Sequence, residues 1–294
     1  MIDNSRTRTS LTLRRFDDPA AFSAAALPFL MAHEAEHCLP IGIVAGLIER
    51  PEQFEPGIYL ATVERGGAVV AVAVRTPPWN VVLSRTSVSE STAIFAEDLL
   101  PDHPGLPGVL GPSALSRIFA EEWRRLTGRG YRLVIAQRIY QLETVTPVTG
   151  IPGALRRAGE ADRELAIDWA RAFWAEAAPG RDAGAAERSV ASRLTSSVGG
   201  IFFWEDDGQP VSLVGYGGPT PNGFRIGPVF TPAEYRRQGY ASAATAAVSQ
   251  MLLDGGRRFC FLFTDLANPS SNNIYQAIGY RPVRDVDEYQ FATA

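Results

Sequence analysis

A short run between an expected strand and an expected helix could bind phosphate. The run reads Arg236-Arg237-Gln238-Gly239-Tyr240-Ala241. The first N–H groups of a helix have no partner inside the helix and lie at the positive end of its dipole. Gly239 would let the backbone approach a phosphate closely, and the small Ala241 would keep the helix start open, which makes an anion nest for a pyrophosphate. Alone, the pattern Arg-x-x-Gly-x-Ala also fits an ordinary strand-to-helix turn.

Two further stretches flank this run in chain order. Upstream stands Ile226-Gly227-Pro228-Val229-Phe230-Thr231, the end of an expected strand whose backbone can present free N–H and C=O groups. Downstream, after one more expected strand, stands Asn268-Pro269-Ser270-Ser271-Asn272-Asn273-Ile274-Tyr275, which closes with Gly279-Tyr280. The three stretches in this order are far more specific than the loop alone.

This ordered set resembles the GNAT acetyltransferase superfamily. The motif A of that family is R/Q-x-x-G-x-G/A, and its motif B is N-x-x-(A/S)-x-x-x-Y, closed by Gly-Phe or Gly-Tyr. The chain carries the motif B residues at those spacings, namely Asn268, Ser271, Tyr275, Gly279 and Tyr280. The resemblance covers the chain from about Gly153 to its last residue. It implies an enzyme that moves an acetyl group from acetyl-CoA, its cosubstrate, to an amine.

The resemblance also implies roles for the cofactor-binding residues. The backbone at Val229, Phe230 and Thr231 would pair with the pantetheine arm as an added strand does. Amides of the loop would bind the pyrophosphate, with positive charge nearby from Arg236 and Arg237. Those amides belong to Gln238, Gly239, Tyr240, Ala241 and Ser242.

At the start of the next helix, Asn268 has two compatible interpretations. It would hold the pantetheine together with Ser271, or it would act as an N-cap before the Pro-containing first turn. Tyr275 is the expected catalytic residue, because a Tyr there commonly protonates the departing CoA thiolate in this family, and a phenol stays protonated at neutral pH. A plain core role for Tyr275 is the alternative.

The general base is left open by the sequence. Residues 224–231 hold no acid where many relatives carry a Glu. A water chain, Asp265 or Glu205 could take the proton, because direct attack of an amine needs mainly orientation and the loss of one proton.

The chain also contains a zinc-protease pattern, His33-Glu34-Ala35-Glu36-His37, on an expected helix. Such a site needs a third ligand, yet Pro40 and Ile43 stand where the metzincin extension needs Gly and His. We interpret the pattern as a solvated helix face and expect no metal.

Helices and strands are expected to alternate in both halves. Helices are expected at residues 19–47 with a break near Pro40, 113–127, 160–176, 185–194, 239–253 and 268–278, and residues 99–111 are expected to be loop. Strands are expected at 58–64, 68–74, 79–84, 131–145, 200–205, 211–217, 224–231, 258–264 and 281–291. The best linker is residues 144–153.

A weak repeat relates the two halves. Residues 114–128 and 241–255 have equal length, and each ends in Gly before a strand. In this register the run from Val109 to Ala114 aligns with residues 236–241, the phosphate loop. Pro112 then stands in place of Gly239, and a proline lacks the backbone N–H. The following segment lacks an Asn…Tyr helix, and Tyr140 matches the neighbours of Tyr275 by chance only. We therefore expect the first half to be a degenerate copy that walls the acceptor groove.

Composition excludes several classes of function. The sequence contains no Lys, which excludes lysine nucleophiles and phosphate loops ending in Gly-Lys. The formal net charge of −4 gives no basic field, so no nucleic-acid partner is expected. Cys38 and Cys260 are expected to be buried structural thiols. Residues 1–6 are polar, and the apolar stretches are too short to span a bilayer, so a cytoplasmic protein without signal peptide or membrane contact is expected.

The sequence thus predicts an α/β protein of two GNAT-like mixed β-sheet domains flanked by helices. Residues 1–150 would form the degenerate domain and residues 151–294 the catalytic N-acetyltransferase domain. The acceptor would be a small-molecule or peptide amine. The alternative is a non-catalytic acyl-CoA-binding or regulatory module of the same fold.

Overall fold

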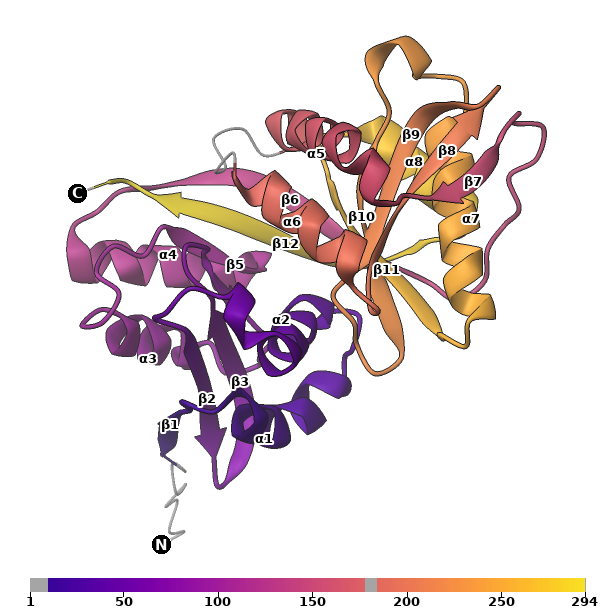
Figure 1. Cartoon of the computed structure of the whole chain (residues 1–294). Coiled ribbons are helices and arrows are strands. Elements are labelled where there is room, and N and C mark those ends of the chain that lie inside the picture. Colours follow the sequence, from indigo (N-terminus) through magenta and orange to yellow (C-terminus); the bar gives the residue numbers. More distant parts are fainter. Residues whose placement is uncertain (1–9, 178–183, 294) are drawn as a thin grey trace, which may run out of the picture. The chain divides into compact units, whose positions relative to one another are not determined.

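A computed structural model of the chain describes residues 10–177 and 184–293 (Figure 1). The chain divides into two compact units. Unit 1 holds the residues up to Ala136 together with those from Asp285 onward, and unit 2 is Gln137–Arg284. Residues 1–6, for which no signal peptide was expected, lie outside the described residues. Among the described helices, none has both the length and the apolar character needed to cross a membrane.

Unit 1 is a mixed sheet covered by helices on both faces. Its helices are α1 (Pro19–Met31), α2 (Cys38–Glu49), α3 (Glu90–Leu99) and α4 (Ser113–Thr127). Its strands are β1 (Leu11–Arg15), β2 (Tyr59–Arg65), β3 (Ala68–Arg75), β4 (Val81–Leu83), β5 (Gly108–Pro112) and the end of β12 (Arg281–Phe291), in the order β1-β2-β3-β4-β5-β12. Strands β4 and β5 pair parallel, and the other neighbours pair antiparallel.

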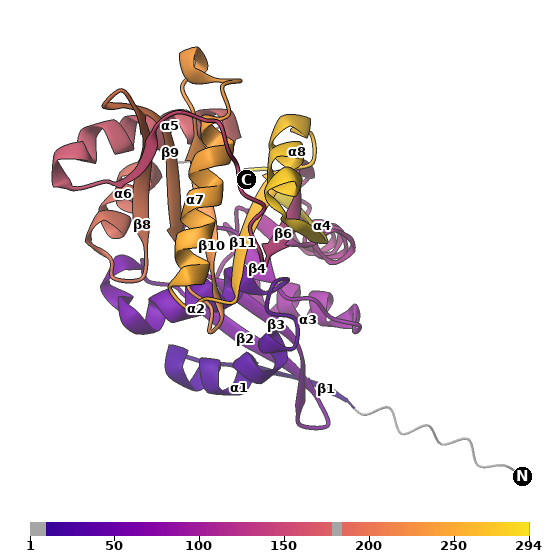
Figure 2. The same ribbon diagram turned by 90° about the vertical axis from the view of Figure 1, so that its right-hand side faces the viewer.

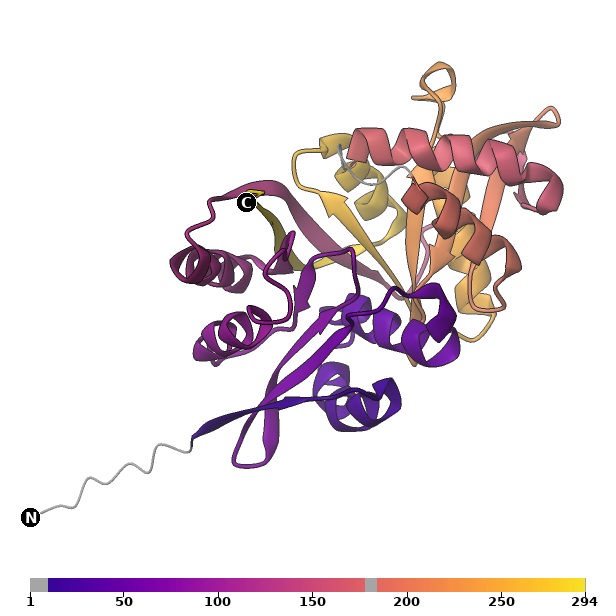
Figure 3. The same ribbon diagram turned by 60° about the vertical axis from the view of Figure 1, so that its left-hand side comes forward.

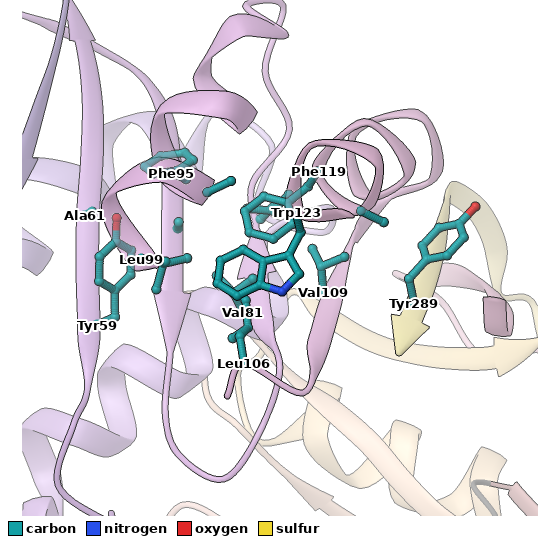
Figure 4. Packing of buried hydrophobic residues seen from close by; sticks show 14 of the residues in the cluster. Tyr59, Ala61, Val81, Phe95, Leu99, Leu106, Val109, Phe119, Trp123 and Tyr289 are labelled. Atoms are coloured by element: carbon teal, nitrogen blue, oxygen red, sulfur yellow. The ribbon is translucent and has the colours of Figure 1, made fainter. Parts of the chain in front are cut away.

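Side chains along the strands of unit 1 belong alternately to two hydrophobic cores, one on each face of the sheet, because successive side chains of a strand point to opposite faces. Along β2, Tyr59 and Ala61 belong to the core under α3 and α4, whereas Leu60 belongs to the core under α1 and α2. Figure 4 shows the first of these cores, where Phe119 and Trp123 of α4 stack with ring centroids 6.1 Å apart. Large apolar side chains on both faces therefore anchor the sheet.

Unit 2 repeats this architecture. Its helices are α5 (Arg163–Ala177), α6 (Gly184–Thr195), α7 (Tyr240–Asp254) and α8 (Pro269–Ile278). Its strands are β7 (Ala154–Arg157), β8 (Gly200–Asp206), β9 (Gln209–Gly217), β10 (Gly223–Phe230), β11 (Phe259–Asp265) and the end of β6 (Tyr131–Leu142), in the order β7-β8-β9-β10-β11-β6. Strands β10 and β11 pair parallel, and the other neighbours pair antiparallel.

The helices of unit 2 lie on both faces of its strands. Figure 3 shows α5 and α6 over one face, where Phe203 and Leu213 join their core. Figure 2 shows α7 and α8 side by side, and their core takes up the alternate residues Phe202 and Val214. Both cysteines are buried, Cys38 in unit 1 and Cys260 in unit 2, as predicted.

The strand order corrects the repeat register expected from the sequence. Helix α7 connects the parallel pair β10 and β11, and the helix that connects the parallel pair β4 and β5 is α3. The equal lengths of α4 and α7, 15 residues each, misled the register. The counterpart of the phosphate loop is therefore the β4–α3 connection, residues 84–89. Pro112 does not occupy the position of Gly239, and α4 is the counterpart of α8.

The last strand of each half completes the sheet of the other unit. From Gln137 onward β6 pairs with β11 in unit 2, whereas Val286–Gln290 of β12 pair with β5 in unit 1. The division thus falls inside two strands and differs from the boundary expected after residue 150. The expected linker lies inside unit 2, where the Thr146 amide donates to the Ile278 carbonyl at 2.7 Å. Sequence patterns locate strands but not their pairing partners, which explains the difference.

Two elements of the first half also differ from expectation. Strand β5 occupies part of residues 99–111, the region expected to be loop, and helix α3 (Glu90–Leu99) begins in a region for which the sequence predicted no element. The break between α1 and α2 falls at residues 32–37, while Pro40 lies in the first turn of α2, where Pro needs no N–H partner.

Candidate active site

Strands β10 and β11 separate after a short paired stretch. Their ladder runs from Gly223↔Phe259 to Arg225↔Phe261, although β10 continues to Phe230 and β11 to Asp265. On its other side β10 stays paired with β9, with a register shift between Ile226 and Val229. Such a bulge bends a strand and redirects its end. The backbone at the end of β10 is thereby released from β11, which opens an edge that an extended molecule can pair with.

The end of β10 is held in place from the β9 side. The Ser212 hydroxyl donates to the Phe230 carbonyl at 3.1 Å and lies 2.8 Å from the hydroxyl of Thr231. Val229 and Phe230 face Val214 and Leu213 in the ladder with β9. The residues expected to pair with a pantetheine arm are therefore held in place by β9.

The phosphate loop has the backbone shape of an anion nest. Arg237 and Gly239 adopt left-handed conformations, with φ of +63° and +87°. Helix α7 begins at Tyr240, and its first hydrogen bond runs from the Ala243 amide to the Gly239 carbonyl, 3.0 Å. The amides of residues 240–242 precede that bond and belong to the donors of the first helical turn. The loop thus presents N–H groups in the connection that follows β10.

Gly239 is required for a second reason beyond its backbone angle. A Cβ on this residue would lie 2.5 Å from Cδ1 of Ile151. Ile151 belongs to the segment between β6 and β7, whose Pro152 carbonyl accepts a 2.8 Å hydrogen bond from the Trp204 indole. The segment expected to be a linker is therefore part of the wall of the loop.

The two arginines of the loop have different surroundings. The Arg236 guanidinium donates to Glu176 of α5 at 2.6 Å and to the Thr231 carbonyl at 2.8 Å. Arg237 is exposed. Arg236 therefore closes the turn after β10, and its charge is partly compensated by Glu176, whereas the side chain of Arg237 reaches solvent beside the loop.

Tyr240 contributes its backbone to the loop and turns its side chain inward. Its buried phenol donates to Asp206 at the end of β8, at 2.5 Å. This hydrogen bond is the main cause that raises the pKa of Tyr240. The first residue of α7 is thereby anchored to the β8–β9 hairpin, which sets the direction of the helix and of its N–H groups.

Helix α8 starts on the cap that the sequence predicts. The Asn268 side chain accepts a 3.0 Å hydrogen bond from the Ser271 amide, which confirms its N-cap role. The Asn272 amide group donates to the carbonyls of Asp265 and Asn268, at 2.8 and 2.7 Å. The turn from β11 into α8 is therefore cross-braced by two asparagines.

Tyr275 lies on α8 inside the core that α7 and α8 cover. Its side chain is 9% exposed, and its ring centroid is 6.0 Å from that of Tyr280. Within the described ranges its hydroxyl has no hydrogen bond. Burial raises the pKa of Tyr275 to about 12, so the phenol carries its proton at neutral pH and can donate it.

Both carboxylates considered as the base already have partners. Glu205 accepts a hydrogen bond from Arg156 at 2.6 Å, so its charge is compensated. Asp265, at the end of β11, accepts from the Ala267 amide at 2.8 Å and closes a turn. The sequence left three candidates for the group that takes the proton from the amine. Of these, only a water chain does not require Glu205 or Asp265 to give up a present partner.

Tyr140 is the residue that sequence reasoning missed. It lies on β6, is 1% exposed, and donates its hydroxyl proton to Asn272 at 3.0 Å while accepting from Gln276 at 3.2 Å. The sequence feature that could have pointed to it is the pair Asn272 and Gln276, two amide side chains four residues apart and so on one face of α8.

The HExxH pattern lies in the turn between α1 and α2, so the expected solvated helix face is wrong. His37 is buried, with Nδ1 2.8 Å from the Leu30 carbonyl and Nε2 accepting from the Arg85 amide at 3.1 Å. Both ring nitrogens are thus used by the backbone. Burial lowers the pKa of His37. In the part of the chain that the structure describes, no group of His, Cys, Asp or Glu side chains could hold a metal ion.

The corresponding region of unit 1 is built differently. Residues 84–89 contain no glycine, and the Arg85 amide is already bound by His37. A Cβ on Gly111 of β5 would lie 3.0 Å from Cβ of Leu83, so β4 and β5 are still in contact where β4 ends. Glu90 in the first turn of α3 also adds negative charge where an anion would bind. These features distinguish unit 1 from the open edge of unit 2.

The sequence similarity of this chain to a known family lies within unit 2. Residues 164–280 match the model of the acetyltransferase (GNAT) family. No curated protein matches the sequence.

Three solved structures share the fold over nearly the whole chain. A GCN5-related N-acetyltransferase from Sphaerobacter thermophilus is 15% identical with a TM-score of 0.62, and the match covers 96% of this chain and 95% of that one. A tandem GNAT protein from the clavulanic acid biosynthesis pathway is 14% identical with a TM-score of 0.59, over 97% and 98%. A GNAT-family acetyltransferase from Colwellia psychrerythraea is 11% identical with a TM-score of 0.55, over 96% and 100%.

Proposed function

Since this chain is a member of the GNAT superfamily, we propose that unit 2 transfers an acetyl group from acetyl-CoA to an amine. One observation carries the proposal. The paired stretch of β10 and β11 ends at Arg225 and Phe261, with the nest of N–H groups after β10 and the buried phenol of Tyr275 on the helix after β11. An extended thioester needs an open strand edge, a pyrophosphate needs donors, and a leaving thiolate needs an acid.

In the proposed reaction, acetyl-CoA is a substrate that supplies the thioester. The backbone of residues 229–231 would pair with its pantetheine arm, and the amides of residues 238–242 would bind its pyrophosphate, with Arg237 adding positive charge. The side chain of Asn268 already caps α8, so its contribution to cosubstrate binding would be to fix the start of that helix. Ser271 would act through its backbone, whose amide completes that cap.

The transfer itself would be a direct attack. The amine nitrogen bonds to the thioester carbon, the carbon–sulfur bond breaks, and the sulfur takes the proton of the Tyr275 hydroxyl. The nitrogen loses its extra proton to a water chain. Tyr275 regains a proton from water after CoA leaves. The chain's contribution is mainly orientation and a placed acid, since an amine is already a good nucleophile once neutral.

The test is release of CoA from acetyl-CoA in the presence of a panel of amines (amino acids, polyamines, aminoglycosides and peptides). Released thiol can be measured with a thiol reagent, because Cys38 and Cys260 are both buried. We expect amine-dependent release with at least one class. Tight binding of acetyl-CoA without release would instead support the non-catalytic module. Absence of binding would overturn the assignment of the site.

A further inference from the structure

We propose that Tyr140 is a positioning residue, whose hydroxyl holds helix α8 in the place where Tyr275 can act as the acid. This inference rests on the proposed function for its catalytic consequence. Tyr140 belongs to β6, a strand contributed by the first half of the chain, and it neighbours Leu262 of β11 in the ladder. A side chain from outside the motifs would thus govern the geometry of the motif that bears the acid.

The hydroxyl of Tyr140 joins two side chains of α8. It donates to Oδ1 of Asn272 and accepts from Nε2 of Gln276. These two residues bracket Tyr275 on the helix. Because Asn272 and Gln276 stand four residues apart, one hydroxyl spans a full helical turn and restricts its rotation about the helix axis.

Asn272 extends this contact to the end of β11. Its Nδ2 donates to the carbonyls of Asp265 and Asn268, which leaves Oδ1 as the acceptor for Tyr140. The amide orientation is therefore determined by its partners. One asparagine links β6, β11 and the first turn of α8, and the loss of the Tyr140 hydroxyl would detach β6 from this network.

Tyr140 holds this contact from the core, because it is 1% exposed and lies in the same core cluster as Tyr275. Asn272 is half-buried and Gln276 is exposed, so the two hydrogen bonds lie at the edge of that core. Loss of the Tyr140 hydroxyl would therefore release these two side chains toward solvent and free the helix from β6. Helix α8 has ten residues, a length at which tertiary contacts rather than helix propensity fix the position. A shift of an acid by about 1 Å can cost about a hundredfold in rate.

The first test measures whether Tyr140 holds α8. Hydrogen exchange of the α8 amides would be compared between the intact chain and the variant Tyr140→Phe. Tyr59→Phe is the matched control, because Tyr59 is also a buried tyrosine, 3% exposed, whose hydroxyl donates at 2.8 Å to Asp98 in unit 1. We expect faster exchange of α8 in Tyr140→Phe and unchanged exchange of α8 in Tyr59→Phe. Equal exchange in all three proteins would overturn the proposal, whether or not the chain has transferase activity.

The second test measures the link to Tyr275. In amine-dependent CoA release, Tyr140→Phe should lower kcat by about tenfold to a hundredfold and leave KM for acetyl-CoA nearly unchanged. In a Tyr275→Phe background the same change should have little further effect, because the acid that it positions is gone. An equal loss in both backgrounds would show a purely structural role and contradict the proposal. An inactive intact chain would refute the proposed function, and the exchange measurement would still decide the role of Tyr140.

Discussion

At the scale of single residues, Tyr275 combines a buried ring with a hydroxyl that makes no hydrogen bond to any described side chain. The elevated pKa of about 12 follows from burial, because the ionised phenolate is poorly solvated there. A phenol with so high a pKa keeps its proton at neutral pH, so in the proposed reaction it has a proton to donate to the departing thiolate. The phenolate left behind is the stronger base and regains a proton from water.

The first prediction concerns this hydroxyl. Tyr275→Phe should lower kcat for amine-dependent CoA release by about a hundredfold or more, the usual contribution of a placed acid. The Kd for acetyl-CoA, measured by calorimetry, should change little, because the phosphate loop and the end of β10 are untouched. Since the pKa lies near 12, the rate of the intact chain should not fall through ionisation of Tyr275 below about pH 10. An unchanged kcat in the variant would remove Tyr275 from the mechanism.

His37 yields a prediction about pH and stability. Burial lowers the pKa of His37 below the ordinary 6.5. The hydrogen bond to the Leu30 carbonyl and the charge of Glu36 oppose the shift, and His33 and Arg85 reinforce it. The unfolded chain therefore binds a proton more readily than the folded one, so stability is present above pH 6.5 and is lost as the pH falls through the folded pKa. Urea midpoints should drop between about pH 7.5 and pH 5.

The variant His37→Gln separates the contribution of His37 to the pH dependence of stability from the contributions of other titratable groups. Glutamine can still donate to the Leu30 carbonyl or accept from the Arg85 amide, but it does not titrate. We expect a lower midpoint at neutral pH and a shallower loss on acidification. Part of the slope should persist, because burial also lowers the pKa of His103. If the urea midpoint of the variant changed with pH as steeply as that of the intact chain, the acid sensitivity would come from groups other than His37.

At the scale of elements, the phosphate loop depends on the segment that precedes β7. Gly239 has a left-handed backbone and also lies against Ile151. Gly67, in the β2–β3 turn, has a similar φ of +81° with no atom within 4 Å of the Cβ position. The two glycines therefore separate the cost of backbone strain from the cost of a clash.

Gly67→Ala should destabilise the chain by roughly 1–2 kcal/mol, the usual cost of a left-handed alanine. Gly239→Ala should cost more, because the Ile151 side chain must also shift to relieve the clash. It should also weaken acetyl-CoA binding, because a methyl group here hinders close approach of the backbone to a phosphate. Adding Ile151→Ala to Gly239→Ala should return the cost toward that of Gly67→Ala. Unfolding free energies from urea titration would decide, and equal costs for the two single variants would show that the contact with Ile151 carries no weight.

At the scale of the whole molecule, the two halves exchange their last strands. A chain of residues 151–294 contains every motif, yet it lacks the part of β6 that pairs with Cys260–Asp265 of β11. That edge carries apolar residues, and an unpaired apolar edge favours aggregation. Residues 137–284 keep the strand and match unit 2.

We therefore expect residues 151–294 to be insoluble or unfolded and residues 137–284 to be soluble with a cooperative thermal transition. Circular dichroism and size-exclusion chromatography of both truncated chains would test this. A folded monomer of residues 151–294 would show that β6 is dispensable for the sheet of unit 2.

Much of the candidate site could be predicted from local sequence. The Asn268 cap, the turn at Gly239 before a helix and the buried strand around Cys260 each depend on residues within a few positions of one another, so motif and composition were sufficient. The order of strand, loop, helix and second strand followed from the same patterns.

What the sequence could not determine is which distant groups meet. Tyr140 and Asn272 are 132 positions apart, and Arg236 and Glu176 are 60 apart. A hydrogen bond depends on distance and direction in space, and a strand pairs with whichever edge its length and side chains fit. The sequence alone therefore determined which residues unit 2 has available for the proposed chemistry. Only the tertiary structure decided that β6 completes that unit and that Tyr140 braces the helix of Tyr275.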